Sequence, residues 1–374
     1  MGSYIVQAGD TLYSIARNHG QTTRAFVEAN PGILERPLVV GEVLQLPNAP
    51  EGHPSIETNG YIDSTTDDAM LLDVLPYFTY LSIFGHRITI DGYLVGTNNT
   101  QMIQTARAAR VAPMMVVSNT TENGFYSRAL IHAVLTNPAA SQRLIDGILS
   151  TLQQQDYYGV NLDMEFIAPE DFPLYVRFLQ TLSSVLQPYD YRRFIVVRII
   201  TVLEQQETLS RMLSPGDFMH LSDRFVIHTN EWACNARLDL PLMDLAQQAI
   251  DYATSLVPGS SIIIGIPNCC FRWSLPYKPN TAPHFLTAKE AEALSRMTGA
   301  YFQMDSQTGA SYFQYADTDG ITNMVWCPNR CSNQTILSLV RIYHLGGVSY
   351  RMVNDFSITD YQSMQAMFDI KKVL

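Results

Sequence analysis

Lysine is scarce in this chain of 374 residues and occurs only as Lys278, Lys289, Lys371 and Lys372. Charged residues of all types make up only 16% of the chain, and the acidic ones outnumber the basic ones, so the formal net charge is −11. Nucleic acids and anionic membranes attract proteins through positively charged surfaces. We therefore expect neither a nucleic acid nor a membrane as the main partner.

Cysteine and long apolar runs are scarce as well. Five cysteines in a chain of this length do not make a disulfide framework, and we predict that most of them are buried thiols. Cys327 and Cys331 lack a companion His or Cys pair at zinc spacing, so we expect no metal site. No run of about 18 apolar residues is present, which predicts no membrane span. The first residues show neither a basic nor an apolar segment, so no secretory signal is visible.

Hydrophobic residues, in contrast, make up 47% of the chain, which is enough for a large core. The length exceeds that of one small domain and fits a barrel-sized domain with a small appendage.

The appendage is predicted at residues 1–48, in the order β-α-α-β. Tyr4–Val6 and 43–47 are short apolar strands, and capping and stop residues between them mark two helices. Three motifs of this segment resemble the LysM family, which binds N-acetylglucosamine-containing glycans. They are the run Tyr-x-Val-x-x-Gly-Asp-Thr-Leu, an Asn-Pro pair and a Gly-x-x-Leu-x-Leu-Pro ending. The alternative is a LysM fold without a working groove. The resemblance implies that the glycan lies between two loops, at Gly9, Asp10, Thr11, Leu12, Asn30 and Pro31.

Residues 49–55 are predicted to be a linker because of their Pro and Gly content. Beyond it, over 56–374, apolar strands alternate with amphipathic helices, a pattern that fits an α/β fold of the (β/α)₈ barrel type. A small antiparallel insertion is expected between the seventh and eighth strands, at about 275–330. The predicted strands are 56–62, 77–84, 112–118, 159–165, 194–200, 224–229, 261–267 and 347–352, and the clearest helices are 100–110, 139–154, 170–186, 242–256 and 334–344.

The predicted strand 159–165 carries the most informative pattern of the chain. Asn161, Asp163 and Glu165 alternate with apolar residues, so in a strand their side chains share one face. Two carboxylates one strand repeat apart repel each other, which raises the proton affinity of one of them. An acid that stays protonated near neutral pH can serve as a general acid. The alternative is a strand whose polar face is merely wet, but this strand is otherwise too apolar to face solvent.

The same run resembles the Asp-Gly-x-Asp-x-Asp-x-Glu strand of glycoside hydrolase family 18. The resemblance implies that Glu165 protonates the glycosidic oxygen and then activates water. It also implies that Asp163 orients the substrate's 2-acetamido group, whose carbonyl oxygen is the nucleophile. This chemistry needs no metal and no cofactor. Further runs are similar to the branch of spore cortex-lytic and germination glycosidases, which often pair LysM modules with this barrel, at 59–61, 80–84, 168–171, 265–267, 325–326 and 346–350.

The chain departs from the family pattern at three supporting places. Tyr158 and Asn161 replace the first two Asp residues of the strand, and Asn161 can still hydrogen-bond to Asp163 but adds no charge. At the end of the eighth strand Arg351 replaces the Trp that usually lies under the sugar.

The third departure lies on the sixth strand, where Met-x-Tyr-Asp/Glu-Trp becomes His228-Thr229-Asn230-Glu231-Trp232. Glu231 and Trp232 fit the pattern, but Asn230 replaces the Tyr whose hydroxyl supports the acetamido group. We interpret His228 as a buried, hydrogen-bonded core residue rather than a proton shuttle.

Aromatic residues at strand ends are further candidates for contact with a glycan. Trp232, Trp273 and Trp326 can stack on sugars, and the alternative for each is core packing. Tyr61 and Asn119 end earlier strands, where they would line the cleft.

The sequence therefore predicts an N-acetylglucosaminidase that acts on peptidoglycan, or on another N-acetylglucosamine polymer, in a spore cortex or cell wall. Two alternatives remain: a wall-binding protein with weak or no catalysis, and a chitinase. Localisation at the spore coat, cortex or wall follows from the resemblance, and a cytoplasmic protein is otherwise expected. No protein partner is inferred.

Overall fold

A computed structural model describes residues 3–7, 9–12, 15, 26–27, 29–33, 36–46, 53–198, 221–229, 242–277, 283–305, 310–328 and 330–374.

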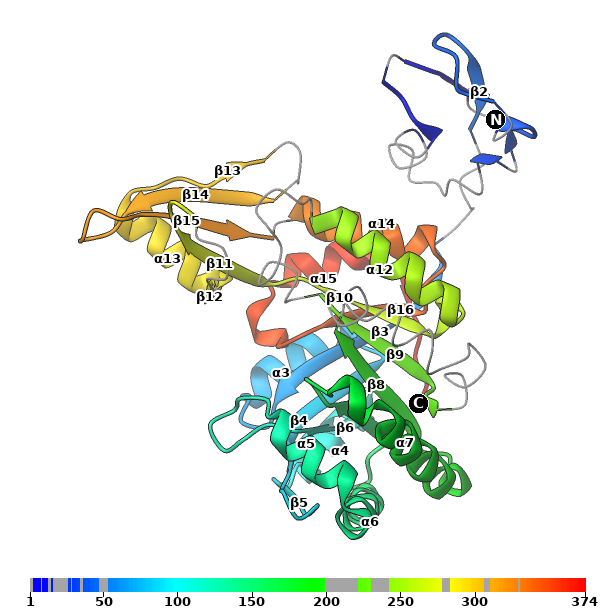
Figure 1. Cartoon of the computed structure of the whole chain (residues 1–374), viewed down its shortest axis with the longest axis vertical. Coiled ribbons are helices and arrows are strands. Elements are labelled where there is room, and N and C mark those ends of the chain that lie inside the picture. Colours follow the sequence, from blue (N-terminus) through cyan, green and yellow to red (C-terminus); the bar gives the residue numbers. More distant parts are fainter. Residues whose placement is uncertain are drawn as a thin grey trace.

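Eight parallel strands form a closed barrel, which confirms the predicted fold class (Figure 1). The strands are β3 (Ser55–Asp63), β4 (Tyr80–Ile88), β6 (Ala112–Ser118), β7 (Gly159–Asp163), β8 (Arg192–Arg198), β9 (Arg224–His228), β10 (Ile262–Ile266) and β16 (Gly347–Tyr350). Each strand pairs with the next one along this series, and β16 pairs with β3 to close the barrel. Two short strands, β5 (Leu94–Gly96) and β17 (Asp369–Ile370), pair with β4 and β3.

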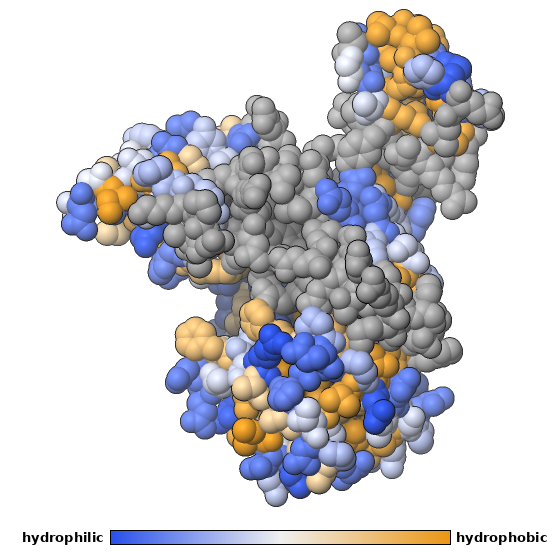
Figure 2. All heavy atoms as spheres, viewed as in Figure 1, coloured by the Kyte–Doolittle hydropathy of each residue, from blue (hydrophilic) through white to orange (hydrophobic). Residues whose placement is uncertain are grey.

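Helices cover the outside of the barrel, because parallel neighbours need crossover connections. They are α3 (Asp68–Val74), α4 (Thr100–Ala108), α5 (Arg128–Thr136), α6 (Pro138–Gln155), α7 (Phe172–Leu186), α12 (Leu242–Leu256), α14 (Arg330–Ile342) and α15 (Ile358–Gln365). On the face shown in Figure 2, hydrophilic and hydrophobic residues are interspersed over the lower barrel, as expected for helices that bury one face. Within the described ranges, no helix is long and apolar enough to cross a bilayer.

The inside of the barrel is filled by side chains. Tyr61, Met114, Phe194 and Ile263 belong to one buried cluster contributed by different strands. At the start of β7 the neighbouring strand comes so close that a Cβ on Gly159 would lie 2.2 Å from the carbonyl oxygen of Arg192. The barrel is therefore a packed core, and a ligand site has to lie at one of its ends.

The insertion between the seventh and eighth barrel strands is a five-stranded antiparallel sheet with one helix. It lies to one side of the barrel in Figure 1, and its first strand begins at Cys269, ahead of the predicted start near 275. The order across the sheet is β12-β11-β15-β14-β13. The elements are β11 (Cys269–Ser274), β12 (His284–Thr287), α13 (Ala288–Thr298), β13 (Gln303–Met304), β14 (Ser311–Ala316) and β15 (Thr322–Cys327).

A disulfide links Cys270 on β11 to Cys327 on β15 inside this insertion. The expectation of buried thiols is wrong for these two residues. The physical reason is the antiparallel pairing of β11 with β15, which brings together two cysteines that are 57 positions apart in the sequence.

In the N-terminal segment β1 (Ser3–Ile5) pairs antiparallel with β2 (Val43–Gln45). Ile15, Phe26 and Leu44 form its small core. Both predicted strands are present, and most residues of the two predicted helices lie outside the described ranges, as do residues 49–52 of the predicted linker.

An ion-pair network joins β3 to β9 and the C-terminal segment. The buried carboxylate of Glu57 on β3 accepts bonds of 2.6 and 2.7 Å from Arg224 and one of 3.1 Å from Lys371. Burial alone would raise the pKa of Glu57. The opposing effect of Arg224 and Lys371 is larger, so the pKa of Glu57 lies below its usual value. The network therefore ties the first and sixth barrel strands to the end of the chain.

Replacing Glu57 by Gln is expected to lower the free energy of unfolding by about 3–5 kcal/mol, because Arg224 loses its buried counter-charge. A pKa that is depressed in the folded state stabilises the fold above the ordinary glutamate pKa, and this stabilisation is lost as the pH falls. Urea unfolding should therefore show a large difference from wild type at neutral pH and a smaller one in acid. Glu170→Gln, at an exposed carboxylate, is the matched control. A difference that does not depend on pH would contradict this.

Candidate active site

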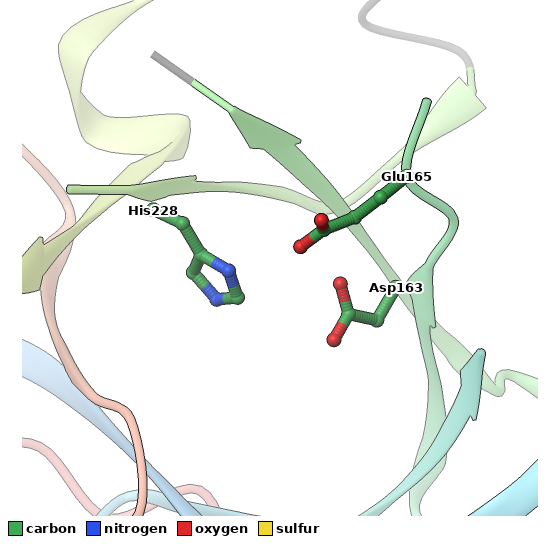
Figure 3. Close-up of side chains that lie close together, drawn as sticks. All are labelled: Asp163, Glu165 and His228. Atoms are coloured by element: carbon green, nitrogen blue, oxygen red, sulfur yellow. The ribbon is translucent and has the colours of Figure 1, made fainter. Parts of the chain in front are cut away.

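Three titratable side chains converge at the carboxyl end of the barrel. Asp163 ends β7, Glu165 follows two residues later, and His228 ends β9. Figure 3 shows the two carboxyl groups and the imidazole turned toward one another. One oxygen of each acid and one ring nitrogen lie within 4.8 Å of one another. The three residues are 0%, 3% and 4% exposed, so the groups interact in a site largely closed to water.

The backbone of Glu165 is held by Asn119, which follows β6. The Asn119 side chain donates to the Glu165 carbonyl oxygen at 2.8 Å and accepts from the Glu165 N–H at 2.9 Å. The next residue, Phe166, has a φ of +58°, in the left-handed region that is unfavourable for a bulky side chain. Asn119 was predicted to line the cleft, but the structure uses its amide to fix the backbone of Glu165.

Asp163 is held through one of its two carboxylate oxygens. The Tyr126 hydroxyl donates to Oδ2 at 2.6 Å, and Nη1 of Arg351 lies 3.4 Å from the same atom. Burial first, and then the charge of Asp163, raise the pKa of Tyr126, so this hydroxyl keeps its proton and remains a donor. Oδ1 is buried and has no hydrogen-bond partner among the described residues.

Arg351, directly after β16, reaches three elements of the site. Nη2 donates to the Tyr126 hydroxyl and Nη1 to Nδ1 of His228, each at 2.8 Å. The guanidinium also lies over the ring of Phe84 on β4, 5.5 Å from its centre. Burial would lower the pKa of Arg351, but Tyr126, Asp163 and Glu165 raise it, so the group stays charged.

Asp163, Glu165 and His228 offer atoms of the types that bind metal ions. Arg351 already provides a positive charge at this place, bonded to His228 and close to Asp163. A guanidinium cannot accept a hydrogen bond, so Nδ1 of His228 is the acceptor and the ring is neutral. The three side chains therefore fit the protein's own cation better than a metal ion.

Asn161 lies one layer deeper and does not bond to Asp163. Its Nδ2 instead donates to the Tyr61 hydroxyl at 2.8 Å and to the Ser82 hydroxyl at 2.9 Å. The predicted Asn161–Asp163 bond is wrong, because these partners reach the amide from other strands. Tyr61 is fully buried in the barrel, so it supports the floor of the site and does not line an open cleft.

The predicted tryptophans differ in their surroundings. Trp273 is buried and packs edge-on against Tyr277, with ring centres 5.2 Å apart, as the core alternative expects. Trp326 is half-buried and stacks on Tyr312 at 5.0 Å on the insertion sheet, and therefore keeps part of its ring exposed. Asn230, Glu231 and Trp232, which the sequence predicts to belong to the site, lie outside the described residues.

In the N-terminal domain, two of the predicted glycan-binding side chains bond within the domain. Asp10 accepts from the Tyr4 hydroxyl at 2.8 Å and from the Gln7 N–H at 2.6 Å. The Asn30 side chain accepts a hydrogen bond from the Gln45 N–H at 2.8 Å and donates one to the Gln45 carbonyl oxygen at 2.9 Å. These bonds shape the two loops. The remaining candidates are Gly9, with a φ of +88°, the partly buried Leu12, and Thr11 and Pro31 in the same loops.

Tyr126 is the residue of this site that the sequence interpretation missed. It lies in the loop between β6 and α5 and forms an isolated antiparallel bridge with Thr120. The Asn123-Gly124 pair between them is a strong turn signal, and Gly124 has a φ of +81°. That signal predicts a chain reversal that would return the following segment, with Tyr126, toward the barrel.

An apolar hollow begins at Glu165 and Phe166 and extends behind β8 and β9, between α7 and α12. Residues 199–220, between β8 and β9, lie outside the described ranges, so we assign no ligand to this hollow.

The closed parallel barrel, with two acids at the carboxyl end of its fourth strand, defines the class of protein. The family model "Glycosyl hydrolases family 18" matches residues 58–351, and the chain belongs to this family of glycoside hydrolases. The LysM domain model matches residues 4–47. Both resemblances seen in the sequence are thereby confirmed.

Among known proteins, the chain is 26% identical over 378 residues to a Bacillus subtilis (strain 168) protein named "Putative sporulation-specific glycosylase YdhD", covering 99% of this chain and 88% of that one. It is 25% identical over 409 residues to the cortical fragment-lytic enzyme of the same organism, covering 94% of each. The crystal structure of the Bacillus cereus spore cortex-lytic enzyme SleL superposes with a TM-score of 0.73 and 25% identity, covering 100% of this chain and 88% of that one.

Proposed function

We propose that this protein is a β-N-acetylglucosaminidase that cleaves peptidoglycan of the spore cortex or cell wall. The support is the family membership, the LysM domain, and relatives whose names refer to lysis of spore cortex or cortical fragments. Spore or wall association follows from the same relatives. We further propose the division into a glycan-binding domain at 1–48, a linker at 49–55 and a hydrolase barrel at 56–374.

In this proposal Glu165 is the general acid and then the general base, and Asp163 orients the acetamido group of the sugar. The observation that carries it is the geometry of these two acids: both are buried at the carboxyl end of β7 and close to each other. An acid pair in this arrangement suits substrate-assisted hydrolysis, in which the acetamido oxygen attacks the anomeric carbon. The carboxylate of Asp163 would accept from the acetamido N–H and stabilise the positive charge that develops on that group.

The LysM domain would keep the barrel close to its polymer. A second binding module on the same chain raises the local concentration of cleavable bonds without any new contact at the barrel. We propose the loops at Gly9–Leu12 and at Asn30–Pro31 as its glycan contacts. Trp326, with its partly exposed ring on the insertion, is proposed as a contact of the barrel with glycan.

A wall-binding protein without catalysis is the second candidate. The observation that favours it is the contact of Arg351 with Asp163, which engages the carboxylate that the substrate would need.

The test is digestion of purified cortex peptidoglycan, vegetative peptidoglycan and chitin by the full-length protein, followed by counting reducing ends and separating the products. Release of muropeptides that end in N-acetylglucosamine from peptidoglycan is expected. Sedimentation with the wall but no product would favour the binding protein. Preferential cleavage of chitin would replace the proposed substrate.

A further inference from the structure

Two departures from the family pattern touch each other in the site. Arg351 replaces the Trp expected after the eighth strand, and His228 replaces the Met expected on the sixth. The structure places Nη1 of Arg351 2.8 Å from Nδ1 of His228. Residues in contact influence each other's effects on stability and activity. These two replacements therefore have to be interpreted together.

His228 and its neighbours hold the guanidinium in one place. His228 accepts from Nη1, the Tyr126 hydroxyl accepts from Nη2, and the Phe84 ring lies beneath the group. The Tyr126 hydroxyl in turn donates its proton to Oδ2 of Asp163. Each of the three residues Arg351, Tyr126 and Asp163 thus contacts the other two, and Asp163 is the acidic one.

Arg351 also sets the net charge of the site. Asn161, where the family has an acid, is neutral, so the described charged groups here are Asp163, Glu165 and Arg351. When Glu165 is protonated, the charges of Asp163 and Arg351 cancel. In a buried site an uncompensated charge is unfavourable, so Arg351 favours the state with one ionised and one protonated acid.

We propose that Arg351 is a positioning residue that anchors Asp163 through Oδ2, leaves Oδ1 to receive the acetamido N–H, and shifts the basic limb of the enzyme's pH profile toward acid. This inference rests on the proposed function, since it assigns Arg351 a part in that reaction. His228 stays neutral in this arrangement, because a proton on Nδ1 would face the guanidinium.

The expected direction follows from the charges that face Arg351. In the described part of the chain these titratable groups are Tyr61 on β3, Tyr126 after β6, Asp163 and Glu165 on and after β7, and His228 on β9. A nearby positive charge stabilises ionised carboxylates. Its removal should make Glu165 bind its proton more tightly. Glu165 would then lose its proton at higher pH.

The test compares the pH dependence of kcat/KM for wild type, Arg351→Lys and Arg351→Met on soluble cortex fragments. For the Met variant the basic limb of the bell-shaped profile should move to higher pH, by about 1 to 3 pH units. For the Lys variant this limb should stay near that of wild type, since the charge is kept. A Met profile that is lower but does not move along the pH axis would overturn the proposal.

A second readout does not depend on hydrolysis. Carboxyl-carbon NMR of protein labelled at Glu follows Glu165 directly, and Glu165→Gln assigns its signal. Its titration midpoint should rise in the Met variant, or in Arg351→Gln if the Met variant does not fold. A titration midpoint of Glu165 that is the same in wild type and variant would overturn the inference. If the variant shifts the midpoint but wild type hydrolyses no glycan, only the proposed function is overturned.

Discussion

Replacing Glu165 by Gln is expected to lower kcat on cortex fragments by about 10²- to 10⁴-fold, the usual contribution of general acid–base catalysis. Glutamine has nearly the same shape, and the Asn119 bonds to the backbone at this position do not involve the replaced side chain. It has no proton to give to the glycosidic oxygen and cannot take one from water. Reducing-end release by purified full-length protein, at saturating substrate, is the measurement.

The matched control is Glu170→Gln, which makes the same chemical change at an exposed carboxylate five residues later. It should leave kcat unchanged. Sedimentation of Glu165→Gln with insoluble peptidoglycan should equal that of wild type, because the N-terminal domain is untouched. If wild type and Glu165→Gln released product at the same rate, Glu165 would not be the general acid.

Replacing Asp163 by Asn is expected to lower kcat by about 10²- to 10³-fold, the effect of losing one electrostatic stabiliser of a transition state. The amide keeps the size of the carboxylate but has no charge with which to stabilise the developing positive acetamido group. Removing this anion also lowers the proton affinity of its neighbour Glu165, so the basic limb of the pH profile should move to lower pH. The pH profile of kcat/KM and the kcat at the optimum measure the two effects.

The direction of that shift separates a catalytic effect from a structural one. Asp163→Asn should move the basic limb down in pH, whereas Arg351→Met should move it up, although both changes break the same contact. Asp146→Asn, on the exposed side of α6, is the control and should change neither kcat nor the profile. A basic limb that moved upward in Asp163→Asn would contradict the account of the charges.

The barrel could be predicted because its strands are buried on both faces and therefore appear as apolar runs. The helices α6, α7 and α12 are long and have a clear helical period, so they were predicted as well. In contrast, α3 and α15 span only 7 and 8 residues, and a pattern of about two turns is too short to stand out. The Cys270–Cys327 bond depends on strand pairing within the insertion, which local sequence does not reveal.

The two acids of the candidate site could be predicted because they follow the two-residue period of the predicted strand 159–165, although β7 itself ends at Asp163. The contacts that hold them come from other elements. Tyr126 reaches Asp163 from a loop, and Arg351 reaches it from the eighth strand. Such contacts are set by how the barrel closes. For the same reason the expected bond from Asn161 to Asp163 was wrong.

The central claim is that Asp163 and Glu165 hydrolyse glycan with the help of the substrate's own acetamido group. The most direct measurement is cleavage by wild type of one peptidoglycan preparation before N-deacetylation, after it, and after chemical re-acetylation. The account predicts product from the first and third samples and none from the second. Equal cleavage of the deacetylated sample would contradict it, since a sugar without the acetyl group has no nucleophile to offer.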